Sequence, residues 1–149
     1  MTHTLIDNSK DVELSTFYIG DTICGIDILN IQEINKHLEF TSVPHSSDDI
    51  KGILNLRGKI VTIFDLGKRL GLNTARIGKN SKNIIVNSGD EHIGFLIDEI
   101  CDVVKANRND IEPAPSNMGG VKGKFFKGVL KTEEQLVGIL DIDVVLEES

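Results

Sequence analysis

Short runs of bulky apolar residues alternate along the chain with turns rich in Gly, Asn, Asp and Ser. Runs of this kind, bounded by such turns, are typical of β-strands. They predict strands over 13–19, 23–29, 53–54, 60–64, 83–86, 92–97, 99–105, 126–131 and 135–141. Residues 66–72 and 142–148 are long enough for short helices, while Ile31, Ile34 and Leu38 fit either a helical turn or a twisted edge strand. The pattern therefore predicts an all-β fold with a few short helices.

Polar or proline-containing segments separate these elements. They predict a loose tail over 1–10, loops over 41–49 and 107–123, and a connector over 73–82 between two halves of the chain.

The predicted strands occur twice in the same order, which indicates an internal repeat. A shift of 76 positions superimposes Gly52 on Gly128, Leu54 on Leu130 and Asp65 on Asp141. A shift of 69 positions superimposes Gly20 on Gly89, Gly25 on Gly94 and Ile28 on Ile97. Each copy supplies about five short strands, enough for a small closed β-barrel that hides its edges. The sequence therefore predicts a single domain, 1–149, made of two barrel subdomains, roughly 13–72 and 83–146, with a groove between them.

One corner of the first copy differs from its counterpart. The hairpin over 52–66 turns at Asn55-Leu56-Arg57-Gly58, and a hairpin corner needs Gly or Asn for its positive φ but does not need Arg. The second copy has Lys131 at the position of Asn55 and Glu133 at the position of Arg57. The strands repeat but the corner does not, which leaves a binding role for Asn55 and Arg57 and a solvated surface turn as equal alternatives.

Charge and cysteine content restrict the function further. The chain has 16 basic and 23 acidic residues, and its net charge of −7 opposes binding to nucleic acid or to an anionic membrane. Cys24 and Cys101 lie far apart in apolar segments, which predicts buried free thiols in a reducing cytoplasm. The N-terminus has no signal-peptide core, and no apolar run approaches the roughly 18 residues of a membrane span. These features predict a cytoplasmic protein.

Enzyme motifs are absent from the sequence. It contains no GxGxxG, GxSxG or HExxH, and the GGVKGK segment at 119–124 fails the spacing of a phosphate loop. No nucleophile, base and orienting group can be assembled, so we expect no catalytic, cofactor-binding or metal-binding residues. A binding module is favoured over an enzyme.

Several segments together resemble the CheW-type chemotaxis coupling proteins. They are Gly25-Ile26-Asp27-Ile28-Leu29, Ile31-Gln32-Glu33-Ile34, Val43-Pro44, Ile50-Lys51-Gly52-Ile53, Asn55-Leu56-Arg57-Gly58, Ile60 to Leu66, Ile93 to Val104, Ile111 to Pro115 and Phe126 to Leu140. The resemblance covers nearly the whole chain. The chain departs from the family at two places. The usual proline-containing run reads Ile60-Val61-Thr62-Ile63-Phe64 here, and Gly67 stands where the family commonly has an Arg.

The resemblance implies two five-stranded, SH3-like β-barrels and a non-enzymatic adaptor without a cofactor. Its partners would be the cytoplasmic tips of methyl-accepting chemoreceptors, whose helical hairpin docks between the barrels, and the regulatory domain of a chemotaxis histidine kinase, which packs end-on. The implied partner-binding residues are Ile31, Glu33, Ile34, Val43, Asn55, Leu56, Arg57, Gly58, Val103 and Val104. An adaptor of a pilus or other non-flagellar sensory array is an open alternative. A small-barrel ligand-binding or nucleic-acid-binding protein is a weaker one, because one Tyr and no Trp leave little for base stacking.

Overall fold

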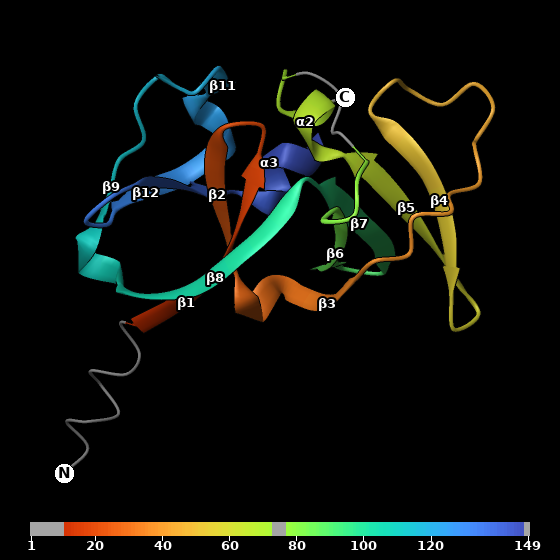
Figure 1. Cartoon of the computed structure of the whole chain (residues 1–149), viewed down its shortest axis with the longest axis horizontal. Coiled ribbons are helices and arrows are strands. Elements are labelled where there is room, and N and C mark those ends of the chain that lie inside the picture. The colour runs from red at the N-terminus through yellow and green to blue at the C-terminus, as the bar shows by residue number, and fades with distance from the viewer. Residues whose placement is uncertain (1–10, 73–76, 148–149) are drawn as a thin grey trace, which may run out of the picture.

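The computed structural model describes residues 11–72 and 77–147 and is built from two curved β-sheets (Figure 1). The six-stranded sheet, called barrel 1 below, has the order β8-β1-β2-β13-β12-β9. The five-stranded sheet, called barrel 2, has the order β3-β6-β7-β5-β4. A third sheet is the small hairpin β10-β11. The predicted all-β fold with two barrel subdomains is confirmed, and barrel 1 has one strand more than predicted.

The strands of barrel 1 are β1 (Asp11–Ile19), β2 (Thr22–Asp27), β8 (Glu99–Asn107), β9 (Ile111–Glu112), β12 (Phe126–Lys131) and β13 (Leu136–Leu140). Those of barrel 2 are β3 (Ile31–Asn35), β4 (Ile50–Leu56), β5 (Lys59–Asp65), β6 (Lys82–Ser88) and β7 (Glu91–Ile97). The small hairpin is β10 (Asn117–Met118) and β11 (Val121–Lys122). The helices are α2 (Leu66–Arg69) and α3 (Ile142–Glu147), with the 3₁₀ turns η1 (Ile28–Asn30), η2 (Arg108–Asp110) and η3 (Gly123–Phe125).

The internal repeat extends to the register of the strands. Phe17 pairs with Cys24 in hairpin β1–β2, and Val86 pairs with Ile93 at the matching place in β6–β7. The hairpins β4–β5 and β12–β13 also match, because each has a bulge before a glycine of its first strand, Gly52 or Gly128. In barrel 2 the hairpins β4–β5 and β6–β7 are joined by the parallel pair of β5 with β7. In barrel 1 the hairpins β12–β13 and β1–β2 are joined in the same way by the parallel pair of β13 with β2.

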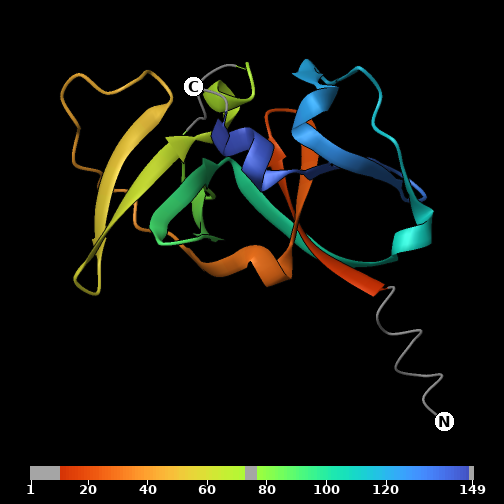
Figure 2. The same cartoon turned by 180° about the vertical axis from the view of Figure 1, so that it is seen from behind.

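The two repeats exchange their hairpins. Barrel 1 takes β1 and β2 from the first half of the chain and its other strands from the second half, whereas barrel 2 takes β3, β4 and β5 from the first half and β6 and β7 from the second. The chain crosses between barrels at η1, after β2, and between β7 and β8 (Figures 1 and 2). The two sheets therefore do not coincide with the predicted halves 13–72 and 83–146.

The largest hydrophobic cluster draws residues from both barrels and from both helices. Phe17 and Ile26 of barrel 1 belong to the same buried cluster as Ile84 and Phe95 of barrel 2. Each barrel also has a smaller cluster of its own, around Leu14 in barrel 1 and around Ile63 in barrel 2. Successive residues of a strand point to opposite faces, so each sheet lines its own barrel with one face and the shared core with the other.

Several predicted elements change their bounds. The predicted strand 23–29 ends at Asp27, where the Asp27 carboxylate accepts a hydrogen bond from the Leu29 N–H and caps η1. The segment that begins at Ile31 is an edge strand, not a helical turn. The predicted loop over 107–123 contains η2, β9 and the β10-β11 hairpin.

The predicted helix over 66–72 is a single turn, α2, and the first part of the connector 73–82, residues 73–76, lies outside the described residues. Within the described helices, none is long and apolar enough to cross a membrane.

The two cysteines are both free but differ in burial. Cys24 is buried, as predicted, and burial raises the pKa of its thiol to about 12. Cys101 is only half-buried because it lies on β8, an edge strand of barrel 1, so the prediction of a buried thiol was wrong for this residue.

Candidate functional site: the Arg57 corner

The corner between β4 and β5 is a two-residue turn with an unusual backbone. Leu56 pairs with Lys59, which leaves Arg57 and Gly58 as the turn, and both have positive φ, 53° and 83°. This is the backbone of a type I′ hairpin turn, in which Asn or Gly is normally found at the first position. A left-handed conformation costs a side-chain-bearing residue about 1–2 kcal/mol. The turn alone therefore does not explain why an arginine stands here.

Neighbouring groups hold the corner in this conformation. The Asn55 side-chain oxygen accepts a hydrogen bond from the Gly58 N–H at 3.1 Å. The Arg57 guanidinium donates from Nη2 to Oε1 of Glu33 on β3 and forms an ion pair with it. Strands β3 and β4 are the two edge strands of barrel 2. The ion pair therefore links the β3 edge of the sheet to the corner at the end of β4, the opposite edge strand.

The charge of Glu33 is stabilised by its neighbours. Its pKa is lowered, first by a hydrogen bond from the Asn35 side chain at 3.1 Å and then by the hydrogen bond from Arg57. The carboxylate is therefore ionised throughout the physiological range, and it neutralises part of the arginine charge. The Arg57 side chain nevertheless remains 77% exposed. Most of the guanidinium is available to a partner.

The matching corner of barrel 1 is built differently. Thr132 and Gln135 close it through a backbone hydrogen bond of 2.8 Å, and the Thr132 hydroxyl accepts from the Gln135 N–H at 3.1 Å. Among the described residues other than glycine, only Arg57 and His45 have positive φ, so Glu133 and Glu134 do not adopt the Arg57 backbone. The two corners thus differ in charge and in conformation.

Two other predicted site residues are exposed and occupy matching positions of the repeat. Ile34 on β3 is 41% exposed and Val103 on β8 is 57% exposed. Ile34 pairs with Ile84, and Val103 pairs with Ser15, which lies two residues before Phe17 on β1. Ile84 and Phe17 belong to the shared core. Directly paired residues share one face of a sheet, so Ile34 and Val103 extend the face of each sheet that is turned toward the other barrel.

The remaining predicted site residues lie in three environments. Ile31 is half-buried against the shared core, and Leu56 and Val104 are half-buried against the inner clusters of barrels 2 and 1. Val43 is 37% exposed in the segment between β3 and β4. The structure thus brings Glu33, Asn55, Arg57 and Gly58 together at one corner, and it places Val43 and Val103 elsewhere.

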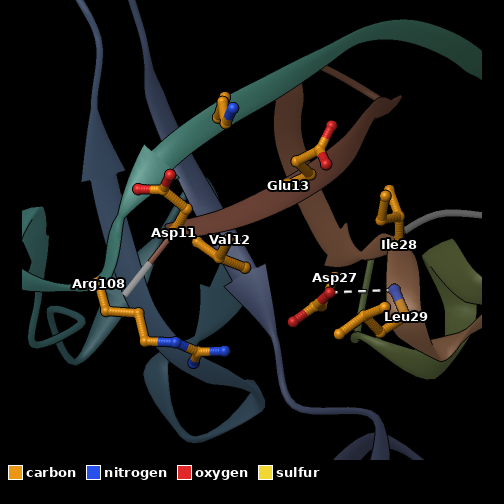
Figure 3. A pocket seen from close by; sticks show the side chains of 8 residues that line it. Asp11, Val12, Glu13, Asp27, Ile28, Leu29 and Arg108 are labelled. Atoms are coloured by element: carbon orange, nitrogen blue, oxygen red, sulfur yellow. Dashed lines mark hydrogen bonds between the residues drawn. The ribbon is translucent and has the colours of Figure 1, made fainter. Parts of the chain in front are cut away.

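A surface hollow beside β1 was not indicated by the sequence. Its charged lining residues come from four elements, Asp11 and Glu13 from β1, Asp27 from β2, Lys105 from β8 and Arg108 from η2 (Figure 3). Leu29, 77% exposed, lies at its rim. No local pattern connects these residues, because they become neighbours only when β1 pairs with both β2 and β8. In the described part of the chain, no group of three or more His, Cys, Asp or Glu side chains is arranged to hold a metal ion.

Two small barrels around a shared core, with an exposed arginine at one corner and apolar residues on facing edge strands, define a binding module of the SH3-like barrel class. Comparison with known proteins identifies the family. The sequence model of the CheW-like domain matches residues 13–149, and the chain belongs to this family.

Relatives and a solved structure agree with this assignment. The chain is 34% identical to the chemotaxis protein CheW of Thermotoga maritima over 146 residues, which cover 97% of this chain and 94% of that protein. It is 30% identical to the chemotaxis protein CheW of Helicobacter pylori, with 96% of this chain and 86% of that protein covered. The crystal structure of the scaffolding protein TtCheW from Thermoanaerobacter tengcongensis matches with a TM-score of 0.84 and 30% identity, covering 91% of this chain and 88% of that one. The chain is thus a member of a family of chemotaxis scaffolding proteins.

Proposed function

We propose that this chain is a non-enzymatic cytoplasmic adaptor that couples methyl-accepting chemoreceptors to a chemotaxis histidine kinase. Its partners are the cytoplasmic tip of the receptor and the regulatory domain of the kinase. Membership in the CheW-like family supports the role. Two free cysteines fit a reducing compartment, and the net charge of −7 disfavours nucleic acid and anionic membranes as direct partners.

The observation that carries the proposal is the Arg57 corner. An arginine occupies a strained turn position, is ion-paired on one side and remains largely exposed. Strain that the local turn does not require is often retained for function. Arginine is also among the residues that dominate binding energies at protein interfaces. Arg57, Asn55 and Gly58 are therefore proposed as a contact for one of the two protein partners.

Apolar edge residues supply the second proposed contact. Ile34 and Val103 are exposed on the sheet faces turned toward the opposite barrel. A helical receptor tip that lies between the barrels would cover both side chains and gain about 25 cal/mol per Å² of buried apolar surface before ordering costs.

The test is substitution of Arg57 by Ala and by Glu. We expect the melting temperature to stay near that of the unmodified protein, because the side chain is exposed and left-handed strain is similar for other side chains. Affinity for the receptor tip or for the kinase regulatory domain, measured by calorimetry, should fall roughly tenfold for Arg57→Ala and further for Arg57→Glu.

The repeat provides a matched control for this experiment. Glu133→Ala changes the counterpart residue in the corner of barrel 1, and it should leave both affinities unchanged. Unaltered dissociation constants for both partners in Arg57→Ala and Arg57→Glu would remove the corner from the proposed binding surface.

A further inference from the structure

A chain of side-chain hydrogen bonds runs from the interior of barrel 2 to the Arg57 corner. Asn83 on β6 is fully buried, and its Nδ2 donates to Oδ1 of Asn35 at 3.0 Å and to the His37 carbonyl at 2.7 Å. Asn35 in turn donates from Nδ2 to Oε2 of Glu33 at 3.1 Å. The other oxygen of Glu33 accepts from Arg57. Two side chains, those of Asn35 and Glu33, thus connect a buried amide with an exposed guanidinium.

Asn83 and the backbone of His37 together set the direction of these hydrogen bonds. A side-chain amide has one accepting end and one donating end. The oxygen of Asn35 already accepts from Asn83 and from the His37 N–H at 3.1 Å. Its NH₂ group must therefore point toward Glu33. If Asn83 were absent, only the His37 N–H would hold the Asn35 oxygen, and the Asn35 NH₂ group would be held less firmly toward Glu33.

The other barrel shows that the fold does not need a polar residue at these places. The repeat places Leu14 at the position of Asn83 and Val104 at the position of Asn35. Leu14 and Val104 pair with each other on β1 and β8, just as Asn83 and Asn35 pair on β6 and β3. Leu14 is fully buried in the inner cluster of barrel 1, and Val104 packs against that cluster. Apolar residues therefore satisfy the same backbone pairing.

Asn83 is also a costly choice for stability. Its Oδ1 is buried and has no hydrogen-bond partner. An unsatisfied buried acceptor lowers the stability of the folded state. Each such group in a native structure requires an explanation, and a functional constraint is one of them.

We propose that Asn83 and Asn35 are positioning residues for the partner-binding corner, which hold the Glu33 carboxylate charged and oriented so that it anchors Arg57. The inference rests on the proposed role of Arg57 in binding. It adds that the corner is preorganised from inside barrel 2, and that the apolar counterparts Leu14 and Val104 leave the corner of barrel 1 without such an anchor. Preorganisation raises affinity because the ordering cost is met before the partner arrives.

The test compares Asn83→Leu with Asn35→Ala and with the control Asn87→Ala. Leucine has the branched shape of asparagine, and the substitution removes the unsatisfied acceptor but also the hydrogen bond to the His37 carbonyl, so Asn83→Leu should melt near the temperature of the unmodified protein. Affinity for the partner that contacts Arg57 should nevertheless fall, by roughly tenfold at most, because Arg57 is less ordered. Asn87 lies on the same strand, and its side chain donates to the Leu29 carbonyl and not to the network, so Asn87→Ala should change neither the affinity nor the pKa of Glu33.

Nuclear magnetic resonance of the Glu33 carboxyl and the Arg57 guanidinium provides a readout that is independent of any partner. In both network variants the pKa of Glu33 should rise toward its ordinary value, because the hydrogen bond from Asn35 is the largest cause of its lowering. Binding by a double variant, Asn35→Ala with Arg57→Ala, should equal that of Arg57→Ala alone, since Asn35 acts through Arg57.

The outcomes separate this inference from the proposed function. If the Glu33 titration and the Arg57 signals are unchanged in Asn83→Leu and in Asn35→Ala, the positioning role is refuted whatever the affinities. If those signals change but Arg57→Ala binds both partners normally, the network is real and the corner is not the binding surface. Additive losses of affinity in the double variant would also refute a role through Arg57.

Discussion

Arg57 and Glu33 illustrate what single residues contribute to this protein. Both residues were predicted as part of a partner-binding surface, but their pairing was not, because they are 24 positions apart in the sequence. Turn chemistry identified the corner, since Gly58 and Asn55 are residues that tight turns prefer. The sequence gives no signal that Arg57 itself adopts positive φ, because the left-handed region is unfavourable for it.

Burial now separates Ile31 from Ile34, two apolar residues of β3. Ile31 packs against the shared core, whereas Ile34 is 41% exposed. We expect Ile31→Asp to lower the free energy of unfolding by about 2–4 kcal/mol, because it brings a charge to the edge of the core. Ile34→Asp should change stability by less than about 0.5 kcal/mol while it weakens receptor binding.

Melting curves and receptor-tip calorimetry measure the two effects separately. The matching variant Val103→Asp on β8 should behave like Ile34→Asp, because it occupies the same place in the repeat. If Ile34→Asp melts as early as Ile31→Asp, Ile34 belongs to the core and the proposed apolar contact is incorrect.

At the scale of elements, two short helices close the two hairpins in the same manner. Asp65 caps α2 by accepting from the Lys68 N–H at 3.3 Å, and Asp141 accepts from the Val144 N–H at 3.3 Å at the start of α3. Helices this short are not stable alone, so tertiary contacts must hold them. Arg69 provides such contacts for α2. Its counterpart in the repeat is Val145, and Arg69 donates to the carbonyl of that residue at 2.7 Å.

Arg69 joins the two helices to the loop that precedes β4. It also donates to the Leu146 carbonyl and to the Asp49 carboxylate, each at 2.7 Å, and lies over the Phe64 ring. The Arg69 side chain is only 5% exposed. Arg69→Met should lower the free energy of unfolding by about 3 kcal/mol in urea at neutral pH, because it leaves a partly buried carboxylate unpaired.

The pH dependence of the Arg69 pair gives a further check on that loss. Burial alone would raise the pKa of Asp49, but hydrogen bonds from Arg69 and Ser47 lower it below its ordinary value. The pair therefore stabilises the protein above about pH 4, the ordinary range of an aspartate, and the contribution disappears as pH falls through the lowered pKa. The difference in the free energy of unfolding between Arg69→Met and the unmodified protein should therefore be smaller at pH 3 than at neutral pH. The exposed neighbour Lys68 serves as the control, and Lys68→Met should cost little at either pH.

At the scale of the whole molecule, the exchange of hairpins makes the two barrels interdependent. Each barrel contains strands from both halves of the chain, and the largest core cluster contains residues of both barrels. Neither half can complete a sheet, because cutting the chain between its halves separates β1 from β8, β2 from β13 and β3 from β6. The repeat in the sequence does not mark two independently folding units.

Separate expression of the two halves tests this interdependence. Fragments 1–78 and 79–149 should each lack dispersed amide signals and a cooperative melting transition, and an equimolar mixture should recover both. As a control, a protease site inserted at 78–80 and cut after folding should leave the two fragments associated, because residues 77–80 are exposed. A fragment that folds alone as a monomer would contradict the exchanged topology.

Local patterns in the sequence determined the strands, the repeat and its register, the Arg57 corner and the family resemblance. Alternation of side chains and turn chemistry act between near neighbours, so they can be read without knowing the fold. Only the tertiary structure decided which hairpins share a barrel, that Arg57 pairs with Glu33, that Arg69 contacts the carbonyl of Val145 and that Asn83 donates to Asn35. These contacts join residues from distant parts of the chain and depend on strand pairing, which leaves no local signal in the residues concerned. Because of the same pairing, matching positions of the repeat form an apolar core contact in barrel 1 and a polar connection to the Arg57 corner in barrel 2.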